Sequence, residues 1–200
     1  MKLPIYLDNH ATTRVDPRVL EAMLPFFAED YGNAASPNHV FGWKAEAAVE
    51  IAREELAAAI GASDPREIVF TSGATESDNL AIQGVVVPGG HVVTAAIEHP
   101  AVLDTCEEME RRGVAVSVVP VDSSGLVDPE RVAGAITEDT ALVSIMAANS
   151  EIGVLQPLAE IGRICRERGV LFHTDAAQAV SKIPLDVEEM GIELLSIYAH

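Results

Sequence analysis

The chain has 200 residues, of which 31 are acidic and 13 are lysine or arginine, so its formal net charge is −18 at pH 7. This charge repels nucleic-acid backbones and anionic membrane surfaces, and the longest apolar stretch, residues 141–148, is too short to span a bilayer. We therefore expect neither nucleic acid nor membrane as a partner. Because residues 1–4 open no secretory signal, we expect a cytoplasmic protein. The acidity is typical of a solvated surface, although a salt-rich habitat or a basic partner would also favour it.

Helical and strand-like patterns alternate along the chain. Predicted helices begin at Asp16-Pro17, cover 42–60, 79–87, 100–112 and 158–168, and start again at Asp128-Pro129. Predicted strands cover 68–70, 91–96, 114–120, 142–146 and 170–173, and a last strand-like run reaches residues 196–200. Strands separated by crossover helices predict an α/β fold with a mostly parallel, doubly wound sheet and helices on both faces.

The two cysteines, Cys106 and Cys165, lie in separate helical patterns and have no metal-ligand spacing. We therefore predict no metal site and interpret both residues as buried, reduced thiols.

The first site signal is the segment Phe70–Ser77, where a strand-like end meets a turn of small residues and a helix start. Free amide hydrogens at a helix N-terminus bind anions such as phosphate, and the Thr75 hydroxyl adds a donor. The same residues also suit a purely structural turn, so this motif needs support from elsewhere in the chain.

Two further motifs follow predicted strands and supply that support. Asp175 could hold a cofactor's ring nitrogen protonated, with Gln178 near a phenolic oxygen, or the two could be a helix cap and an ordinary helix residue. His99 could stack on a planar cofactor and move protons, or cap the following helix. Because the carboxyl ends of parallel strands meet at one edge of a sheet, we expect Thr75, His99 and Asp175 to converge there.

The motifs together resemble the amino-terminal half or more of class I cysteine desulfurases, the iron–sulphur-cluster type of fold-type-I pyridoxal-phosphate enzymes. The resemblance is carried, in order, by Tyr6–Thr13, Gly73–Asn79, Glu98-His99, Asn149–Gly153, His173–Gln178 and the terminal His200. It implies the cofactor pyridoxal 5′-phosphate in a fold-type-I large domain. It also implies that residues 1–15 belong to a small domain or arm, and that residues 16–200 form an incomplete cofactor-binding large domain.

Carried over by position, the resemblance gives His99 and Asp175 catalytic roles, since His99 would stack on the ring and Asp175 would pair with its nitrogen. The other implied cofactor-binding residues are Ala74 and Thr75 at the phosphate, Ser150 and Gln178 at the ring oxygen, and Tyr198 and His200 near the phosphate. Two positions depart from the family pattern. Ser150 stands where a second asparagine is usual, and Tyr198 replaces a small hydroxyl residue.

The implied reaction converts L-cysteine to L-alanine and places the sulphur on an enzyme cysteine as persulfide, for delivery to an iron–sulphur scaffold or another acceptor by a homodimer. In the family, the lysine that binds the cofactor covalently follows this last histidine, and the persulfide cysteine lies beyond it. We expect the chain to be part of a longer enzyme. The alternatives are a truncated or split homologue acting as a binding or scaffold module, and another enzyme of the same fold, such as an aminotransferase or a selenocysteine lyase.

Overall fold

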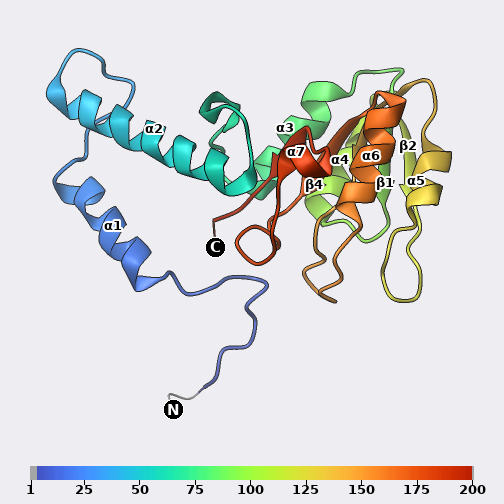
Figure 1. The fold of residues 1–200 in the computed structure, drawn as a ribbon, viewed down its shortest axis with the longest axis horizontal. Helices are drawn as coiled ribbons and strands as arrows, with labels where there is room; N and C mark the ends of the chain where they lie inside the picture. Colours follow the sequence, from blue (N-terminus) through green and yellow to red (C-terminus); the bar gives the residue numbers. More distant parts are fainter. Residues whose placement is uncertain (1–3, 200) are drawn as a thin grey trace. The chain divides into compact units, whose positions relative to one another are not determined.

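The computed structural model describes residues 4–199, which divide into two compact units, the first ending at Val69 and the second spanning Phe70–Ala199 (Figure 1). The first unit contains α1 (Pro17–Ala28), α2 (Val40–Ile60) and the 3₁₀ turn η1 (Pro65–Glu67). Residues 68–70 belong to no strand of the described sheet, so the strand predicted there is wrong. The Ile68 carbonyl instead accepts a hydrogen bond from the Arg53 guanidinium, and Val69 and Phe70 are 65% and 51% exposed.

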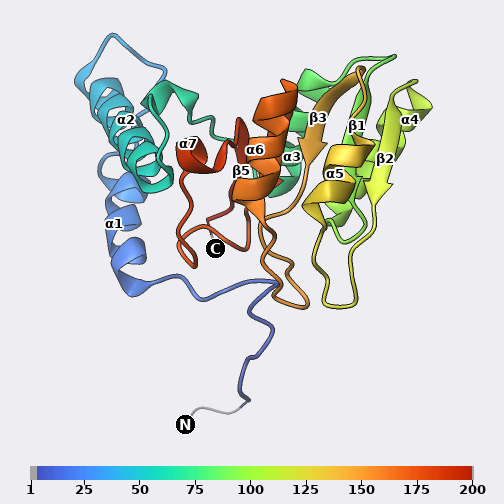
Figure 2. The same cartoon turned by 45° about the vertical axis from the view of Figure 1, so that its right-hand side comes forward.

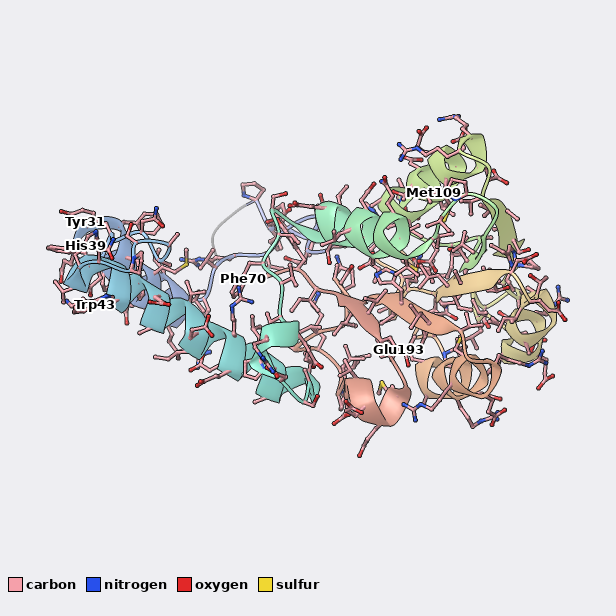
Figure 3. The ribbon with its side chains drawn as sticks, turned by 90° about the horizontal axis from the view of Figure 1, so that it is seen from above. Tyr31, His39, Trp43, Phe70, Met109 and Glu193 are labelled. Carbon is pink, nitrogen blue, oxygen red and sulfur yellow. The ribbon has the colours of Figure 1, made fainter. Side chains whose placement is uncertain are left out.

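The first helix of this unit begins at its predicted cap, and the helix predicted over 42–60 begins two residues earlier, at Val40. The Asp16 carboxylate accepts the amide of Arg18 at 2.8 Å, and Pro17 takes the first helical position of α1. α2 begins at His39, whose Nδ1 accepts the amide of Gly42, and it ends at Gly61, which has the left-handed φ of +72°. Figure 3 labels His39 beside Tyr31 and Trp43 at the start of α2.

The second unit is built on a parallel sheet of five strands in the order β2-β1-β3-β4-β5. The strands are β1 (His91–Ala95), β2 (Ala115–Val119), β3 (Thr140–Ser144), β4 (Leu171–Asp175) and β5 (Leu194–Ser196). The helices are α3 (Ala74–Val85), α4 (Pro100–Arg111), α5 (Pro129–Ala135), α6 (Leu158–Arg168) and α7 (Val187–Met190).

Alternate side chains of the strands build a separate core on each face of the sheet. Val92 of β1 packs with Ile82 of α3 and Val102 of α4. Its neighbour Val93 packs in the other core, which contains Val132 of α5 and Ile161 of α6. Figure 2 shows α5 and α6 in front of the strands. Helices therefore cover both faces, and the predicted doubly wound parallel sheet is confirmed.

The strand order reverses between β1 and β3. From β1 the chain crosses to β2 on one side, whereas from β3 it continues to β4 and β5 on the other. Open parallel sheets bind ligands outside the carboxyl ends of their strands at such a switch point. The residues just after β1, β3 and β4 are therefore the first place to look for a site.

The short helix α7 was not anticipated from the sequence. The Asp186 side chain caps it by accepting the amide of Glu189 at 2.9 Å. α7 lies so close to α6 that a Cβ on Gly162 would stand 1.9 Å from the carbonyl oxygen of Met190. Only glycine fits at this contact. Among residues 4–199, no helix is long and apolar enough to cross a membrane.

Candidate active site

The first turn of α3 presents backbone amides at the sheet edge. Its N-cap is Gly73, with φ +159°, and no side chain between residues 4 and 199 caps the helix. The amides of Ala74 and Thr75 begin the helix, where the helix dipole favours an anion. The Glu76 carboxylate accepts both the amide and the hydroxyl of Ser72, at 2.5 and 2.6 Å, and so holds the preceding turn. These bonds lower the pKa of Glu76.

Asp175 ends β4 and is only 6% exposed. Its Oδ1 accepts the amide of Ala177 at 2.9 Å, and residues 177–180 form turns rather than the helix that was one interpretation of this motif. Burial raises the pKa of Asp175, while the Ala177 hydrogen bond and the charge of His99 lower it. Because burial without a cation costs a carboxylate free energy, a cationic ligand here would be stabilised.

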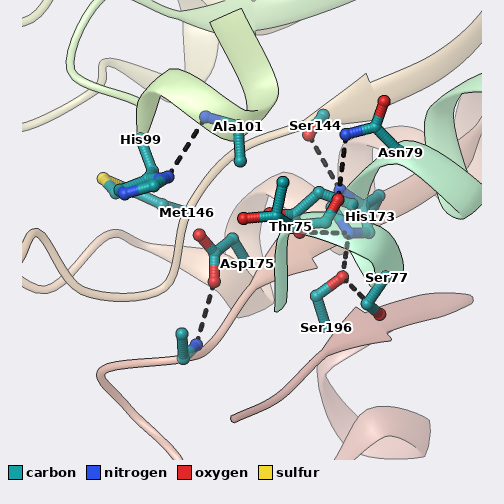
Figure 4. Close-up of polar contacts among 12 residues, drawn as sticks. Thr75, Ser77, Asn79, His99, Ala101, Ser144, Met146, His173, Asp175 and Ser196 are labelled. Carbon is teal, nitrogen blue, oxygen red and sulfur yellow. Dashed lines mark hydrogen bonds and ion pairs between the residues drawn. The ribbon is translucent and has the colours of Figure 1, made fainter. Parts of the chain in front are cut away.

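His99 follows β1 and caps α4, as one interpretation of the sequence required. Its Nδ1 accepts the amide of Ala101 at 3.1 Å. In the neutral ring the proton therefore lies on Nε2, which can donate to a ligand. Its interaction with Asp175 places both side chains at the same sheet edge, and Figure 4 shows Thr75 there too. The expected convergence of the three side chains is thus present.

Two side-chain bonds join the loops on either side of the switch point, and sequence reasoning missed both. Glu98, 5% exposed, accepts the amide of Met146 at 2.8 Å, and Asn149 donates to the carbonyl of Ile97 at 3.0 Å. Burial raises the pKa of Glu98 well above its usual range, while the hydrogen bond from the Met146 amide lowers it. The loop that carries His99 is thereby attached to the end of β3.

A buried polar cluster beneath the first turn of α3 was also missed. It contains His173 of β4, Ser144 of β3, Ser196 of β5 and Ser77 of α3, which Figure 4 labels, together with Asp78 of α3. One signal was available in the sequence. His173 precedes Asp175 by two residues, so the strand pattern puts both on the same face of the sheet.

The remaining predicted cofactor residues lie around the same strand ends. Gln178 is half-buried in the turn after β4, where its Oε1 accepts the Lys182 ammonium at 3.0 Å. Ser150 is half-buried in the loop after β3. Tyr198 is 49% exposed, and a Cβ on Gly73 would stand 3.6 Å from its ring. His200 lies outside the described residues. Their roles stay predictions.

Both cysteines are buried, as the helical patterns predicted. Cys106 is 2% exposed and Cys165 is fully buried. Burial raises the pKa of each thiol to about 12. Neither is therefore a thiolate near neutral pH.

Comparison with known proteins identifies the family. The sequence model of the aminotransferase class-V family matches residues 5–200. Among curated proteins, a cysteine desulfurase IscS of Anaeromyxobacter sp. (strain K) is 59% identical over 100% of this chain and 50% of its own length. A probable mitochondrial cysteine desulfurase of Dictyostelium discoideum is 55% identical over 100% of this chain and 45% of its own.

Solved structures agree with the sequence comparison. One described as SspA in complex with cysteine superposes with a TM-score of 0.92 at 40% identity, covering 98% of this chain and 57% of its own. A NifS-like protein superposes with a TM-score of 0.91 at 43% identity, covering 96% and 54%. The fold and site thus define a fold-type-I α/β enzyme domain. The chain belongs to the aminotransferase class-V family, whose members are pyridoxal-phosphate enzymes, and it spans about half the length of the curated relatives it matches.

The described residues fit that cofactor. The uncapped first turn of α3 suits a phosphate, because its amide donors have no side-chain acceptor within residues 4–199. The buried Asp175 carboxyl suits a protonated ring nitrogen. Both groups lie at the carboxyl edge of one sheet, as a ligand with an anionic end and a cationic ring requires.

Proposed function

We propose that the complete protein is a cysteine desulfurase. In this reaction the Cβ–S bond of L-cysteine breaks, a protein thiolate takes the sulphur, and the carbon takes a proton. The products are L-alanine and a protein persulfide. The observation that carries the proposal is identity of 53–59% to curated cysteine desulfurases along the whole chain.

Pyridoxal 5′-phosphate would supply an electron sink for the bound amino acid. The amides of Ala74 and Thr75 would hold its phosphate, with Tyr198 and His200 beside them. Asp175 would accept the ring N–H, and so keep the ring cationic, while Ser150 and Gln178 would lie near the ring oxygen.

His99 would cover the ring and handle a proton. Since its Nδ1 accepts the Ala101 amide, the geometry supports proton donation from Nε2. Donation at this atom suits the step in which the carbon of the product takes its proton. The loop bonds of Glu98 and Asn149 would hold the imidazole in place.

The test is product analysis with the complete protein. L-Cysteine should give equal amounts of alanine and, without a reductant, protein persulfide, and borohydride should fix the cofactor to the polypeptide mass. Neither alanine nor persulfide from cysteine would refute the proposal. Activity on selenocysteine alone, or amino transfer to a keto acid, would assign the protein to another reaction of the same fold.

We further propose that the complete protein is a cytoplasmic homodimer which hands sulphur to an iron–sulphur scaffold or another acceptor. Bacterial relatives named cysteine desulfurase IscS support the sulphur-donating role, and the homodimer and the cytoplasm follow from the family resemblance. The relative of Dictyostelium discoideum is named a probable mitochondrial cysteine desulfurase, so a mitochondrial location is the alternative.

Replacing either buried cysteine should leave sulphur transfer intact. Cys106→Ala and Cys165→Ala in the complete protein are expected to form as much persulfide from cysteine as the wild type, because both thiols are buried and protonated. Mass spectrometry after cysteine addition measures this directly, with circular dichroism to confirm folding. Loss of persulfide in one folded variant would make that cysteine the sulphur carrier and overturn the assignment.

A further inference from the structure

A continuous chain of hydrogen bonds, buried except at its half-buried Ser77 end, connects β3, β4, β5 and α3 below the candidate site. Ser144 Oγ lies 2.8 Å from His173 Nδ1, and His173 Nε2 lies 3.0 Å from Ser196 Oγ. Ser196 Oγ then donates to Ser77 Oγ at 2.9 Å. Figure 4 shows these bonds in sequence from Ser144 to Ser77. Ser144, His173 and Ser196 are all fully buried.

The direction of the chain fixes the state of the central imidazole. Because Ser196 uses its only hydrogen toward Ser77, it must accept from His173, so the ring carries its proton on Nε2. His173 Nδ1 then accepts the Ser144 hydroxyl. Burial lowers the pKa of His173 to about 4, so the ring is neutral near pH 7. The serine and histidine contacts in this chain are then hydrogen bonds with compatible donors and acceptors.

The buried Asp78 carboxyl lies beside the His173 ring and depends on the surrounding structure to keep its position. Its carboxyl is fully buried, and neither oxygen meets the distance and angle of a hydrogen bond within residues 4–199, although Ser196 lies close enough to lower its pKa. Its Oδ1 lies 3.6 Å from His173 Nε2, beyond a hydrogen bond. A buried polar group without a partner is costly, and it persists only where the surrounding structure holds it.

Residues of this cluster adjoin both the proposed phosphate-binding turn and the proposed partner of the ring nitrogen. Ser77 and Asp78 follow Ala74 and Thr75 within one helical turn. His173 precedes Asp175 by two residues of β4, on the same face of the sheet. The separation between the phosphate-binding amides and the Asp175 carboxyl therefore depends on the contact between His173 and the first turn of α3.

We propose that His173 is a positioning residue that sets this separation: Ser144 holds the ring on one side, and on the other Ser196 connects it to Ser77. The role rests on the proposed cofactor site and does not depend on which amino acid the enzyme converts. A cofactor bound at both ends is sensitive to that distance, because one misplaced end weakens the contacts of the other.

The test compares three variants of the complete protein by their affinity for pyridoxal phosphate, measured by titrating the cofactor-free form. His173→Leu, which removes both hydrogen bonds at similar volume, should weaken binding about tenfold. His173→Gln, which can still donate and accept, should restore most of the affinity. Phe172→Leu is the matched control, because Phe172 is fully buried in the adjacent position of β4 but packs in the core on the opposite face. It should leave affinity unchanged.

Equal weakening in His173→Leu and Phe172→Leu would show general loss of stability and overturn the positioning role. Unchanged affinity in His173→Leu would overturn it too.

If His173→Leu does not fold, nitrogen NMR of histidine-labelled wild-type protein decides. A neutral ring protonated on Nε2 supports the hydrogen-bond chain, and a ring protonated on both nitrogens refutes it. A wild type that binds the cofactor but releases no alanine from cysteine would refute the desulfurase proposal and leave this inference standing.

Discussion

Asp175→Asn in the complete protein is expected to lower turnover with cysteine by about 100- to 1000-fold, the usual cost of removing one preorganised electrostatic contact. The asparagine keeps the shape of the side chain, and its oxygen can still accept the Ala177 amide at the position that Asp175 uses now. It has no negative charge, however, so it does not hold a proton on a ring nitrogen. The change therefore removes the charge and leaves the turn.

Cofactor binding should largely survive this change, because the first turn of α3 is the proposed site for the other end of the ligand. Asp128→Asn is the matched control, since Asp128 also accepts an amide two residues on, at 3.0 Å from Glu130, but caps α5. Steady-state alanine release and cofactor titration on the same samples separate the two effects. Wild-type turnover in Asp175→Asn would refute the proposed pairing with the ring nitrogen.

The sequence was sufficient for the fold class because strong local signals coincide at each boundary. Asp16-Pro17 starts a helix through a cap that needs no tertiary contact. Buried parallel strands such as Val92-Val93 are apolar on both faces and stand out from amphipathic helices. The prediction of a strand at 68–70 was wrong because this segment is equally apolar. A strand also needs a neighbouring strand to pair with, and a short apolar run does not specify one.

The site was predictable only where chemistry and strand ends coincide in the sequence. Thr75, His99 and Asp175 each follow or adjoin a strand-like segment, so convergence followed from the topology. The bond from Glu98 to Met146 joins residues 48 apart. The bond from Ser196 to Ser77 joins residues 119 apart. No local sequence pattern predicts such contacts, because they depend on the strand order, which places β1 beside β3 and β5 beside β4.

The second large expected effect is on the pH dependence of folding stability, through the buried pair Asp78 and His173. Burial, and then the charge of Asp175, raise the pKa of Asp78 from its ordinary 3.8 to about 7, and the neighbouring Ser196 hydroxyl offsets part of this rise. Its folded form thus binds a proton that the unfolded form has lost, and its contribution to stability falls as pH rises from about 4 to 7. Burial lowers the pKa of His173 from 6.5 to about 4, so its contribution falls in the opposite direction, as pH drops from about 6.5 to 4. By proton linkage each effect is about 3–4 kcal/mol.

Single variants should therefore show opposite slopes of stability against pH. Relative to the wild type, Asp78→Asn should gain free energy of unfolding as pH rises from about 4 to 7, and His173→Gln should gain it as pH falls from about 6.5 to 4. The double variant should show both trends, which nearly cancel between pH 4 and 6.5. Urea unfolding of the complete protein at fixed cofactor concentration measures these differences. The buried carboxyls Glu98 and Asp175 are present in every sample, so only the part of their titration that depends on the Asp78 charge differs between variants.

The signs of these slopes distinguish two states of the pair that hold the same number of protons. An ion pair at the 3.6 Å separation of Asp78 and His173 would lower the carboxyl pKa and raise the imidazole pKa, reversing both slopes. The surroundings favour the neutral form, because both side chains are buried and Asp175 lies close enough to oppose a second negative charge. A neutral Asp78 leaves Asp175 as the principal carboxylate facing a ring cation, whereas reversed slopes would mean that the cluster carries charge of its own beneath the site.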